Sequence, residues 1–235
     1  MGEERSRGKA KLMLRIHIIC EGQTEETFVN NVLAPTFLAQ NIMLLPSLLG
    51  KPGHKGGNLK WERLLNDVRN RLTGDRQAYC STFFDYYALP TDFPGRATSA
   101  DRRTAAEKAA EVESHLNMTI REKLGDNVTR RFIPYVQMYE FEGLLFSDTE
   151  TFARSIDRPQ LIPELSAVRK NFATPEDIND SRITAPSKRI RQLIQDYEKP
   201  LMGTIAALEI GLTRMREECH LFNAWIERLE RLEAR

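Results

Sequence analysis

The chain has 235 residues, 41% of them apolar, and its 34 basic residues nearly balance its 33 acidic ones. This composition is typical of one large globular domain, or of one domain with an appendage. The near balance of charge argues against a globally basic nucleic-acid-binding protein, but it still allows a local basic patch on the surface. No apolar run approaches the roughly 20 residues of a membrane helix, and the basic start of the chain lacks a long apolar segment behind it, so we expect neither a membrane span nor a signal peptide.

The cysteines and histidines show no spacing typical of a metal or nucleophile site. Cys20, Cys80 and Cys219 lie far apart and are odd in number, which indicates buried thiols in a reducing cytoplasm and not a disulfide framework or a zinc site. The four histidines form no HxxxH pair, and the sequence has no GxSxG motif. A zinc hydrolase and a serine or cysteine nucleophile are therefore disfavoured.

The first predicted elements lie within residues 12–33. An apolar, β-branched run ends abruptly at Glu21-Gly22, and apolar residues recur with helical spacing from Phe28 onward. This pattern predicts a buried strand, a tight glycine turn and a helix to about residue 40, with a kink or an early end at Pro35. Because ligands collect at the carboxyl ends of parallel strands, Glu21 occupies a favourable position for a site.

The segments that follow alternate between strand and helix patterns. The run at 41–49 contains Pro46, which predicts an edge strand or a bulge. The helix at 99–124 has Ser99 or Asp101 available as its cap. The other predicted elements here are a helix at 61–74, a strand at 79–84 and a strand at 132–138. The order β-α-β-α-β-α-β predicts an α/β fold with a parallel sheet covered by helices.

The pattern changes to short helices in the last part of the chain. They are expected at 149–155, 160–172, 187–197, 202–219 and 221–232. We therefore expect an α/β domain at 1–146 and a helical region at 147–235 that packs on it.

Acidic residues follow three of the four predicted strands. Glu21 ends the first strand, Asp85 ends the third, and Glu140 or Glu142 follows the fourth. The ends of parallel strands meet at one sheet edge, where such carboxylates could hold Mg²⁺ or Mn²⁺ and activate water for attack on a phosphodiester. Glu25 has the pattern of a solvated turn or helix residue, but it is close enough to Glu21 to be a second-site ligand as an alternative.

These acids also have ordinary structural explanations. Glu21 could cap the helix that follows it, and Asp85 could be a turn residue before a proline-rich loop. Glu140 and Glu142 would share one face if the strand continued, and only one of them needs to reach a metal.

Two basic segments are candidates for phosphate contact. A glycine-rich loop carries Lys51, His54 and Lys55 but lacks the order of a P-loop, so a flexible surface connection is the alternative. Lys188 and Arg189 begin a predicted helix and form a basic cluster with Arg182 and Arg191. They form either a solvated helix face or, if the helix folds over the strand ends, a phosphate contact.

Six stretches of the sequence, spanning residues 21–229, carry a family resemblance. They are EGQTEE, FFDYYALPTDFPG, YEFEGLLFSD, PEDIND, APSKRI and IGLTRMREECHLFNAWIERL. Together they resemble a bacterial family, domain of unknown function 4276. More loosely, the strand ending at Glu21-Gly22 is similar to the first motif of Toprim folds, and Asp85 stands where those folds begin an aspartate-x-aspartate pair. Tyr87 takes the place of the second aspartate, so that pair is not intact.

The resemblance implies a Toprim-like, Rossmann-like sheet of four parallel strands and a metal-dependent nuclease that cleaves DNA or RNA. It carries Glu21 and Asp85 over as ligands of Mg²⁺ or Mn²⁺. We expect Glu140 or Glu142 to complete that site and Lys188 to contact phosphate.

Similar proteins are often encoded beside ABC-type ATPases in anti-phage defence systems, which implies an ATPase partner; self-association is a further expectation. Two alternatives stay open. One is a non-catalytic partner or sensor subunit with a vestigial metal site, and the other is a hydrolase of small phosphates.

Overall fold

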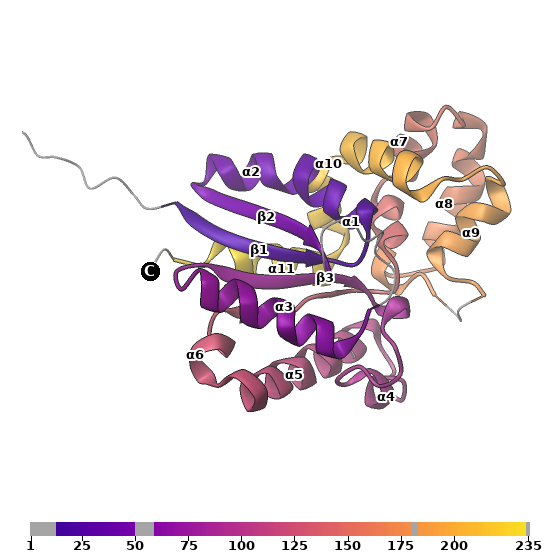
Figure 1. The fold of residues 1–235 in the computed structure, drawn as a ribbon. Helices are drawn as coiled ribbons and strands as arrows, with labels where there is room; N and C mark the ends of the chain where they lie inside the picture. The colour runs from indigo at the N-terminus through magenta and orange to yellow at the C-terminus, as the bar shows by residue number, and fades with distance from the viewer. Residues whose placement is uncertain (1–12, 50–58, 180–182, 234–235) are drawn as a thin grey trace, which may run out of the picture.

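A computed structural model describes residues 13–49, 59–179 and 183–233. At its centre, β2 (Ile42–Leu48), β1 (Leu14–Cys20), β3 (Tyr79–Asp85) and β4 (Phe132–Ile133) form a parallel sheet in that order (Figure 1). The predicted α/β fold with a parallel, helix-flanked sheet is confirmed. β2, which contains Pro46, lies at an edge of this order, as expected of a strand with a residue that cannot donate a ladder hydrogen bond.

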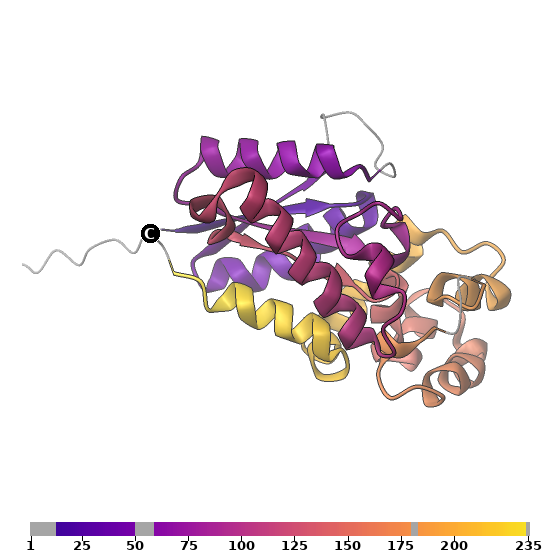
Figure 2. The ribbon, with the colours of Figure 1, turned by 90° about the horizontal axis from the view of Figure 1, so that it is seen from below.

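Successive side chains of the strands face opposite sides of the sheet, and each side has its own helices. Ile18 of β1 packs into one core, and its neighbour Ile19 packs into the other. Figure 1 shows α2 on one side of the sheet and α3 and α5 on the other, and in Figure 2 the yellow helix α11 runs alongside the sheet. The first side is covered by α1 (Gln23–Phe28), α2 (Ala34–Ala39) and α11 (His220–Glu230), and the second by α3 (Trp61–Gly74) and α5 (Ala105–Leu124).

The first helix changes its winding just before Pro35. α1 passes into a π-helical turn, η1 (Val29–Leu33), and then into α2. Pro35 lies in the first turn of α2, where its missing N–H costs little. The helix does not end early at Pro35: it continues to Ala39, and a wider π-helical turn lies just ahead of the proline.

The predicted strand at 132–138 is split in two. Pro134 follows β4, and the chain pairs again with the end of β3 as β5 (Val136–Gln137). The hydroxyl of Thr82 spans the gap, because it donates to Tyr135 O and accepts from Tyr135 N, both at 2.9 Å. The prediction of one continuous strand was wrong because Pro134 has no N–H to donate to the ladder.

The helix expected at 99–124 begins later than predicted. α5 starts at Ala105, and its cap is Thr104: the hydroxyl accepts from Glu107 N at 3.1 Å, and the Glu107 carboxylate accepts from Thr104 N at 3.0 Å. This reciprocal capping box satisfies two backbone donors at once. Ser99 instead ends the short helix α4 (Arg96–Ser99), so the prediction of Ser99 or Asp101 as the cap was wrong.

The last part of the chain is helical, as expected. Its elements, with the short ones that precede it, are η2 (Tyr86–Ala88), α6 (Asp126–Thr129), the 3₁₀ helix η3 (Phe141–Ser147), α7 (Thr149–Ser155), η4 (Pro159–Leu161), α8 (Ile162–Lys170), η5 (Pro175–Asp177), α9 (Pro186–Leu193), the π-helical turn η6 (Lys199–Gly203) and α10 (Thr204–Glu218). Over the described ranges, no helix has the length and apolar character needed to cross a membrane.

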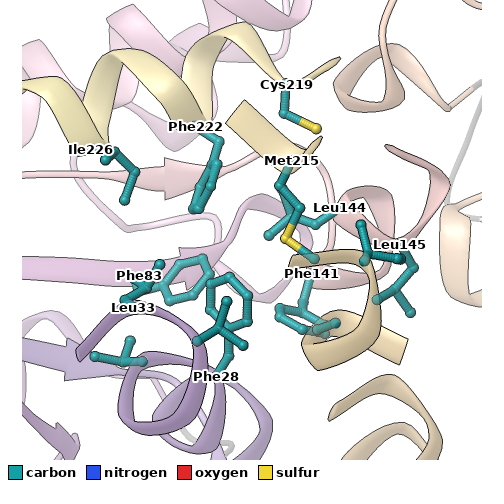
Figure 3. Close-up of a cluster of buried hydrophobic side chains, with 14 of the residues drawn as sticks. Phe28, Leu33, Phe83, Phe141, Leu144, Leu145, Met215, Cys219, Phe222 and Ile226 are labelled. Atoms are coloured by element: carbon teal, nitrogen blue, oxygen red, sulfur yellow. The ribbon is translucent and has the colours of Figure 1, made fainter. Parts of the chain in front are cut away.

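The C-terminal helices and the sheet share a hydrophobic core (Figure 3). The ring of Phe28 in α1 lies 5.8 Å from Phe83 of β3, 5.3 Å from Phe141 of η3 and 6.1 Å from Phe222 of α11, measured between centroids. Because Phe141 stands between Glu140 and Glu142 in the sequence, this core fixes the segment that carries the last two candidate acids.

Candidate active site at the carboxyl end of the sheet

The fold brings Glu21 and Asp85 together at one edge of the sheet. Glu21 follows β1 directly, Asp85 is the last residue of β3, and the two strands are parallel neighbours. Glu21 N donates to Phe83 O at 3.3 Å, and Asp85 N donates to Glu21 Oε2 at 3.1 Å. The backbone of one strand end thus orients the carboxylate of the other.

Lys199 lies among the carboxylates at this edge. Its Nζ is 3.0 Å from Asp85 Oδ2, 3.1 Å from Glu25 Oε1 and 3.3 Å from Glu142 Oε2. Glu25 comes from α1 and Glu142 from η3, and their residues are only 3% and 2% exposed. We call the group Glu21, Glu25, Asp85, Glu142 and Lys199 the acidic centre.

Glu140 and Glu142 have different partners. Phe141 N, between them, donates to Asp85 Oδ1 at 2.7 Å, and Glu142 enters the acidic centre. Glu140 Oε2 instead accepts from Ser187 N at 2.8 Å, at the start of α9. The chain turns into a 3₁₀ helix here, so the two acids do not share the face of a continuing strand.

Glu140 is expected to act mainly on stability. Replacing Glu140 with Ala removes the carboxylate at the start of α9 and should lower the free energy of unfolding by about 1 kcal/mol. Urea unfolding followed by circular dichroism measures this loss. In calorimetric titrations with Mn²⁺, Glu140→Ala should change the affinity less than Glu142→Ala does; the reverse ranking would contradict the assignment.

Lys199 reaches the acidic centre from the π-helical turn η6. Its side chain is 26% exposed, and its Nζ lies 5.6 Å from the ring centroid of Phe141. Gly203, which ends η6, packs so closely that an added Cβ would lie 2.9 Å from the Tyr197 hydroxyl and 3.6 Å from Phe141 Cε1. A side chain at Gly203 would push η6 outward, so this glycine helps to set how deeply Lys199 enters.

Burial dominates the ionisation of the acidic centre. Burial, followed by the nearby Glu25, raises the pKa of Glu21 to about 7, and burial also raises the pKa of Asp85 and of Glu142. Burial alone would lower the pKa of Lys199, but the adjacent carboxylates outweigh it and raise that pKa well above its ordinary value. The adjacent carboxylates thus favour the cationic form of Lys199.

The carboxylate oxygens of the acidic centre are not fully satisfied. Glu25 Oε1 and Glu142 Oε2 are buried and make no hydrogen bond, although both lie at ion-pair distance from Lys199. Three carboxyl groups thus contact one ammonium, and a fourth, that of Glu21, adjoins them. The raised pKa values of Glu21, Asp85 and Glu142 reflect the cost of holding several negative charges in this buried place. Oxygen donors of this kind are the ligands that Mg²⁺ and Mn²⁺ prefer, so the donor set fits such a cation.

The present arrangement is nevertheless centred on the ammonium. In the parts of the chain that the structure describes, no group of three or more His, Cys, Asp or Glu side chains is arranged to hold a metal ion. The carboxylates converge on Lys199, and a metal ion would have to take its place or bind beside it.

A cavity of about 300 Å³ opens onto the acidic centre. Tyr87 forms part of its wall, with its hydroxyl donating to Asn179 Oδ1 and its ring centroid 5.3 Å from that of Tyr139. An aromatic ring therefore borders the cavity two residues after Asp85. The complete lining is Glu21, Asp85, Tyr87, Ala88, Glu140, Glu142, Ser187, Arg191 and Lys199.

The basic residues predicted on α9 do not line this cavity. Lys188 is exposed, and the guanidinium of Arg189 donates to Thr184 O at 2.7 Å and lies over the ring of Phe172. Both residues are absent from the cavity wall, whereas Arg191 is part of it. The helix does come to the strand ends, but it presents a different basic residue there.

Sequence reasoning missed Lys199. It stands before a proline in a polar segment, where a solvated lysine is ordinary, and it lies 114 residues from Asp85. No local spacing links Lys199 to the acids, and only the fold brings them together. Lys51, His54 and Lys55 lie outside the described residues, and their predicted phosphate contact stays a prediction.

The PEDIND stretch has a structural role that the sequence did not reveal. Glu176 is 2% exposed, and its two carboxylate oxygens accept from Leu221 N and Phe222 N, both at 2.8 Å. These donors lie in the first turn of α11, so Glu176 caps the helix that packs against the sheet. Burial raises the pKa of Glu176 to about 7.

This raised pKa predicts a pH-dependent contribution to stability. In the unfolded chain Glu176 ionises near its ordinary pKa of 4.5, but in the folded chain it ionises only near about 7. Between these two pKa values the unfolded state binds fewer protons than the folded state. The contribution of Glu176 to the free energy of unfolding therefore falls as pH rises, by about 3 kcal/mol in total. Above pH 7 this contribution no longer changes with pH. The wild type minus Glu176→Gln difference, from urea unfolding at pH 4.5 to 8, should show this fall; a constant difference would contradict it.

Comparison with known proteins gives one family and no named relative. The model of a family described as a domain of unknown function (DUF4276) matches residues 20–230. That range contains every residue of the acidic centre and confirms the resemblance seen in the sequence, while the kinship with Toprim folds stays an expectation. No curated protein and no solved structure matches the chain.

Proposed function

The chain belongs to the family described as a domain of unknown function (DUF4276), and we infer its activity from its site. We propose that it is a nuclease of Toprim type that uses Mg²⁺ or Mn²⁺ to cleave phosphodiester bonds in DNA or RNA. The observation that carries this proposal is the acidic centre. Its four carboxylates come from three segments, namely residues 21–25, the end of β3 and η3, and three of them contact one ammonium at the sheet edge where α/β folds bind ligands.

A purely structural explanation accounts poorly for this surplus of acid. Three carboxylates lie within 3.3 Å of the Lys199 ammonium, and a fourth adjoins them. Two buried oxygens, on Glu25 and Glu142, have no hydrogen bond. Burying charge without full compensation costs stability, and a divalent cation would remove that cost.

Glu21, Glu25, Asp85 and Glu142 are the residues that would hold the cation. A bound Mg²⁺ or Mn²⁺ would polarise a phosphoryl oxygen and favour ionisation of a bound water. The chain itself would supply orientation, because Phe141 N and Asp85 N hold the carboxylates of Asp85 and Glu21 in place.

Arg191 and Tyr87 border the cavity in front of the acidic centre. Arg191 is the cation there that could contact a substrate phosphate, in the role expected of Lys188 from the sequence. The ring of Tyr87 offers an apolar wall beside it, where a nucleotide base or sugar could pack.

The test is a cleavage assay with the full chain. Purified protein and MnCl₂ are incubated with supercoiled plasmid, single-stranded DNA, total RNA and mononucleotides, beside Glu21→Ala and the matched control Glu164→Ala, whose side chain is exposed on α8. We expect polymer cleavage by the wild type and the control only. Release of phosphate from mononucleotides alone would favour a hydrolase of small phosphates instead.

A non-catalytic partner or sensor subunit with a vestigial metal site is the second candidate. Lys199 at the middle of the acidic centre and Tyr87 in place of an aspartate favour it. Calorimetric titration with Mn²⁺ separates the two proposals: binding that Asp85→Asn abolishes supports the nuclease, and a lack of any Asp85-dependent binding supports the vestigial site. In either case an ABC-type ATPase in anti-phage defence is the partner that we propose, with self-association as a further proposal.

A further inference from the structure

Lys199 places its ammonium among three carboxylates of the acidic centre. Its ammonium lies 3.0–3.3 Å from oxygens of Asp85, Glu25 and Glu142. These distances leave no room for a second cation between the same oxygens, so the ammonium and a metal ion cannot both use all three carboxylates.

We propose that Lys199 is a tethered counter-ion that a divalent cation displaces on binding, so that the wild-type affinity for Mg²⁺ or Mn²⁺ includes the cost of expelling this ammonium. This inference rests on the proposed function, because it requires that the acidic centre binds a divalent cation. It assigns Lys199 as a positioning residue, which keeps the carboxylates gathered in the metal-free protein.

The surroundings of Lys199 permit the exchange. Its side chain is 26% exposed and also lines the cavity of about 300 Å³, so the displaced ammonium has open space beside the acidic centre. The four methylene groups of lysine are flexible, which lets the ammonium move while the backbone of η6 stays in place. A divalent ion carries twice the charge of the ammonium, so it interacts more strongly with the same carboxylates at the same distances.

The exchange explains why two carboxylate oxygens lack hydrogen bonds. An ammonium has three donor hydrogens in fixed directions. That of Lys199 donates to Asp85 Oδ2, while its contacts with Glu25 Oε1 and Glu142 Oε2 are ion pairs without hydrogen-bond geometry. The carboxylates thus surround the ammonium in positions toward which its hydrogens do not all point. A permanent structural ion pair would satisfy these oxygens from its own neighbours.

Calorimetric titration of the full chain with MnCl₂ tests this inference. Wild type is compared with Lys199→Met, which keeps the apolar stem and removes the charge, and with Lys188→Met, whose native side chain is exposed on α9. We expect Lys199→Met to bind Mn²⁺ at least about tenfold more tightly than wild type, and Lys188→Met to match wild type. Unchanged or weaker binding by Lys199→Met would overturn the inference.

A labelling experiment on the wild type keeps the test independent of how well Lys199→Met folds. The protein is treated with an amine-acetylating reagent with and without MnCl₂, and acetylation of each lysine is measured by mass spectrometry. Displacement should raise the labelling of Lys199 several-fold relative to Lys188. Mn²⁺ binding without any rise at Lys199 would overturn this inference alone, whereas a lack of Mn²⁺ binding by wild type and Lys199→Met would overturn it together with the proposed function.

Discussion

Asp85→Asn is expected to abolish metal-dependent cleavage while the protein stays folded. Asparagine keeps an oxygen that can accept the hydrogen bond from Phe141 N, now at 2.7 Å, so the local backbone arrangement should survive. Its NH₂ group replaces the oxygen that accepts from Lys199 Nζ at 3.0 Å, so that contact is lost. It removes the charge that would hold the cation at the end of β3. The loss should reach about a thousand-fold in rate, since metal assistance supplies several kcal/mol of transition-state stabilisation. Initial rates of cleavage with MnCl₂ measure it.

Glu21→Ala is also expected to abolish metal-dependent cleavage, because it removes a different carboxylate of the acidic centre. It deletes the carboxylate at the end of β1, together with the acceptor of the Asp85 N hydrogen bond, and should likewise abolish cleavage without unfolding the chain. Thermal unfolding followed by circular dichroism shows whether each variant is folded, and Glu164→Ala serves as the matched control. Metal-dependent cleavage that both active-site variants retain would sink the nuclease proposal.

The strand ends were predictable from the sequence because their signals are local. Each of β1 and β3 is a short apolar run that stops at an acid, and an acid at the end of a parallel strand has only one edge of the sheet at which to lie. The same reasoning failed at residues 132–138, where a single proline breaks the ladder. Pro134 is visible in the sequence, and its missing N–H accounts for the break.

The centre of the site was not predictable in this way. Lys199 lies in a polar segment far along the chain and reaches Asp85 only because η6 packs against η3 through Gly203. Glu176 is similar: its two hydrogen bonds to the start of α11 cross 45 and 46 residues. Single charged side chains with distant partners leave no periodic trace in a sequence, whereas strands and amphipathic helices do.

Trp225→Ala is expected to produce the largest loss of stability among the substitutions considered. Trp225 in α11 is fully buried, stacks on Tyr135 with ring centroids 4.4 Å apart, and lies 5.4 Å from Phe83 of β3. Its Nε1 donates to Ser81 Oγ at 2.9 Å. Truncation would leave a large cavity between α11 and the sheet and should cost about 3–5 kcal/mol. For a chain of this size the midpoint of thermal unfolding should fall by roughly 10 °C.

The number of unfolding transitions carries as much information as the midpoint. The core of the C-terminal helices is continuous with that of the sheet, so wild type and Trp225→Ala should each unfold in a single transition by circular dichroism, the variant at lower temperature. Trp61→Ala is the matched control, because Trp61 is only partly buried at the start of α3 and has one edge contact with Phe93. Since less apolar surface is lost there, it should cost less than half as much. If the two tryptophan variants were equally stable, or if Trp225→Ala split the transition in two, α11 would not belong to the core that holds Glu21, Asp85 and Glu142 in place.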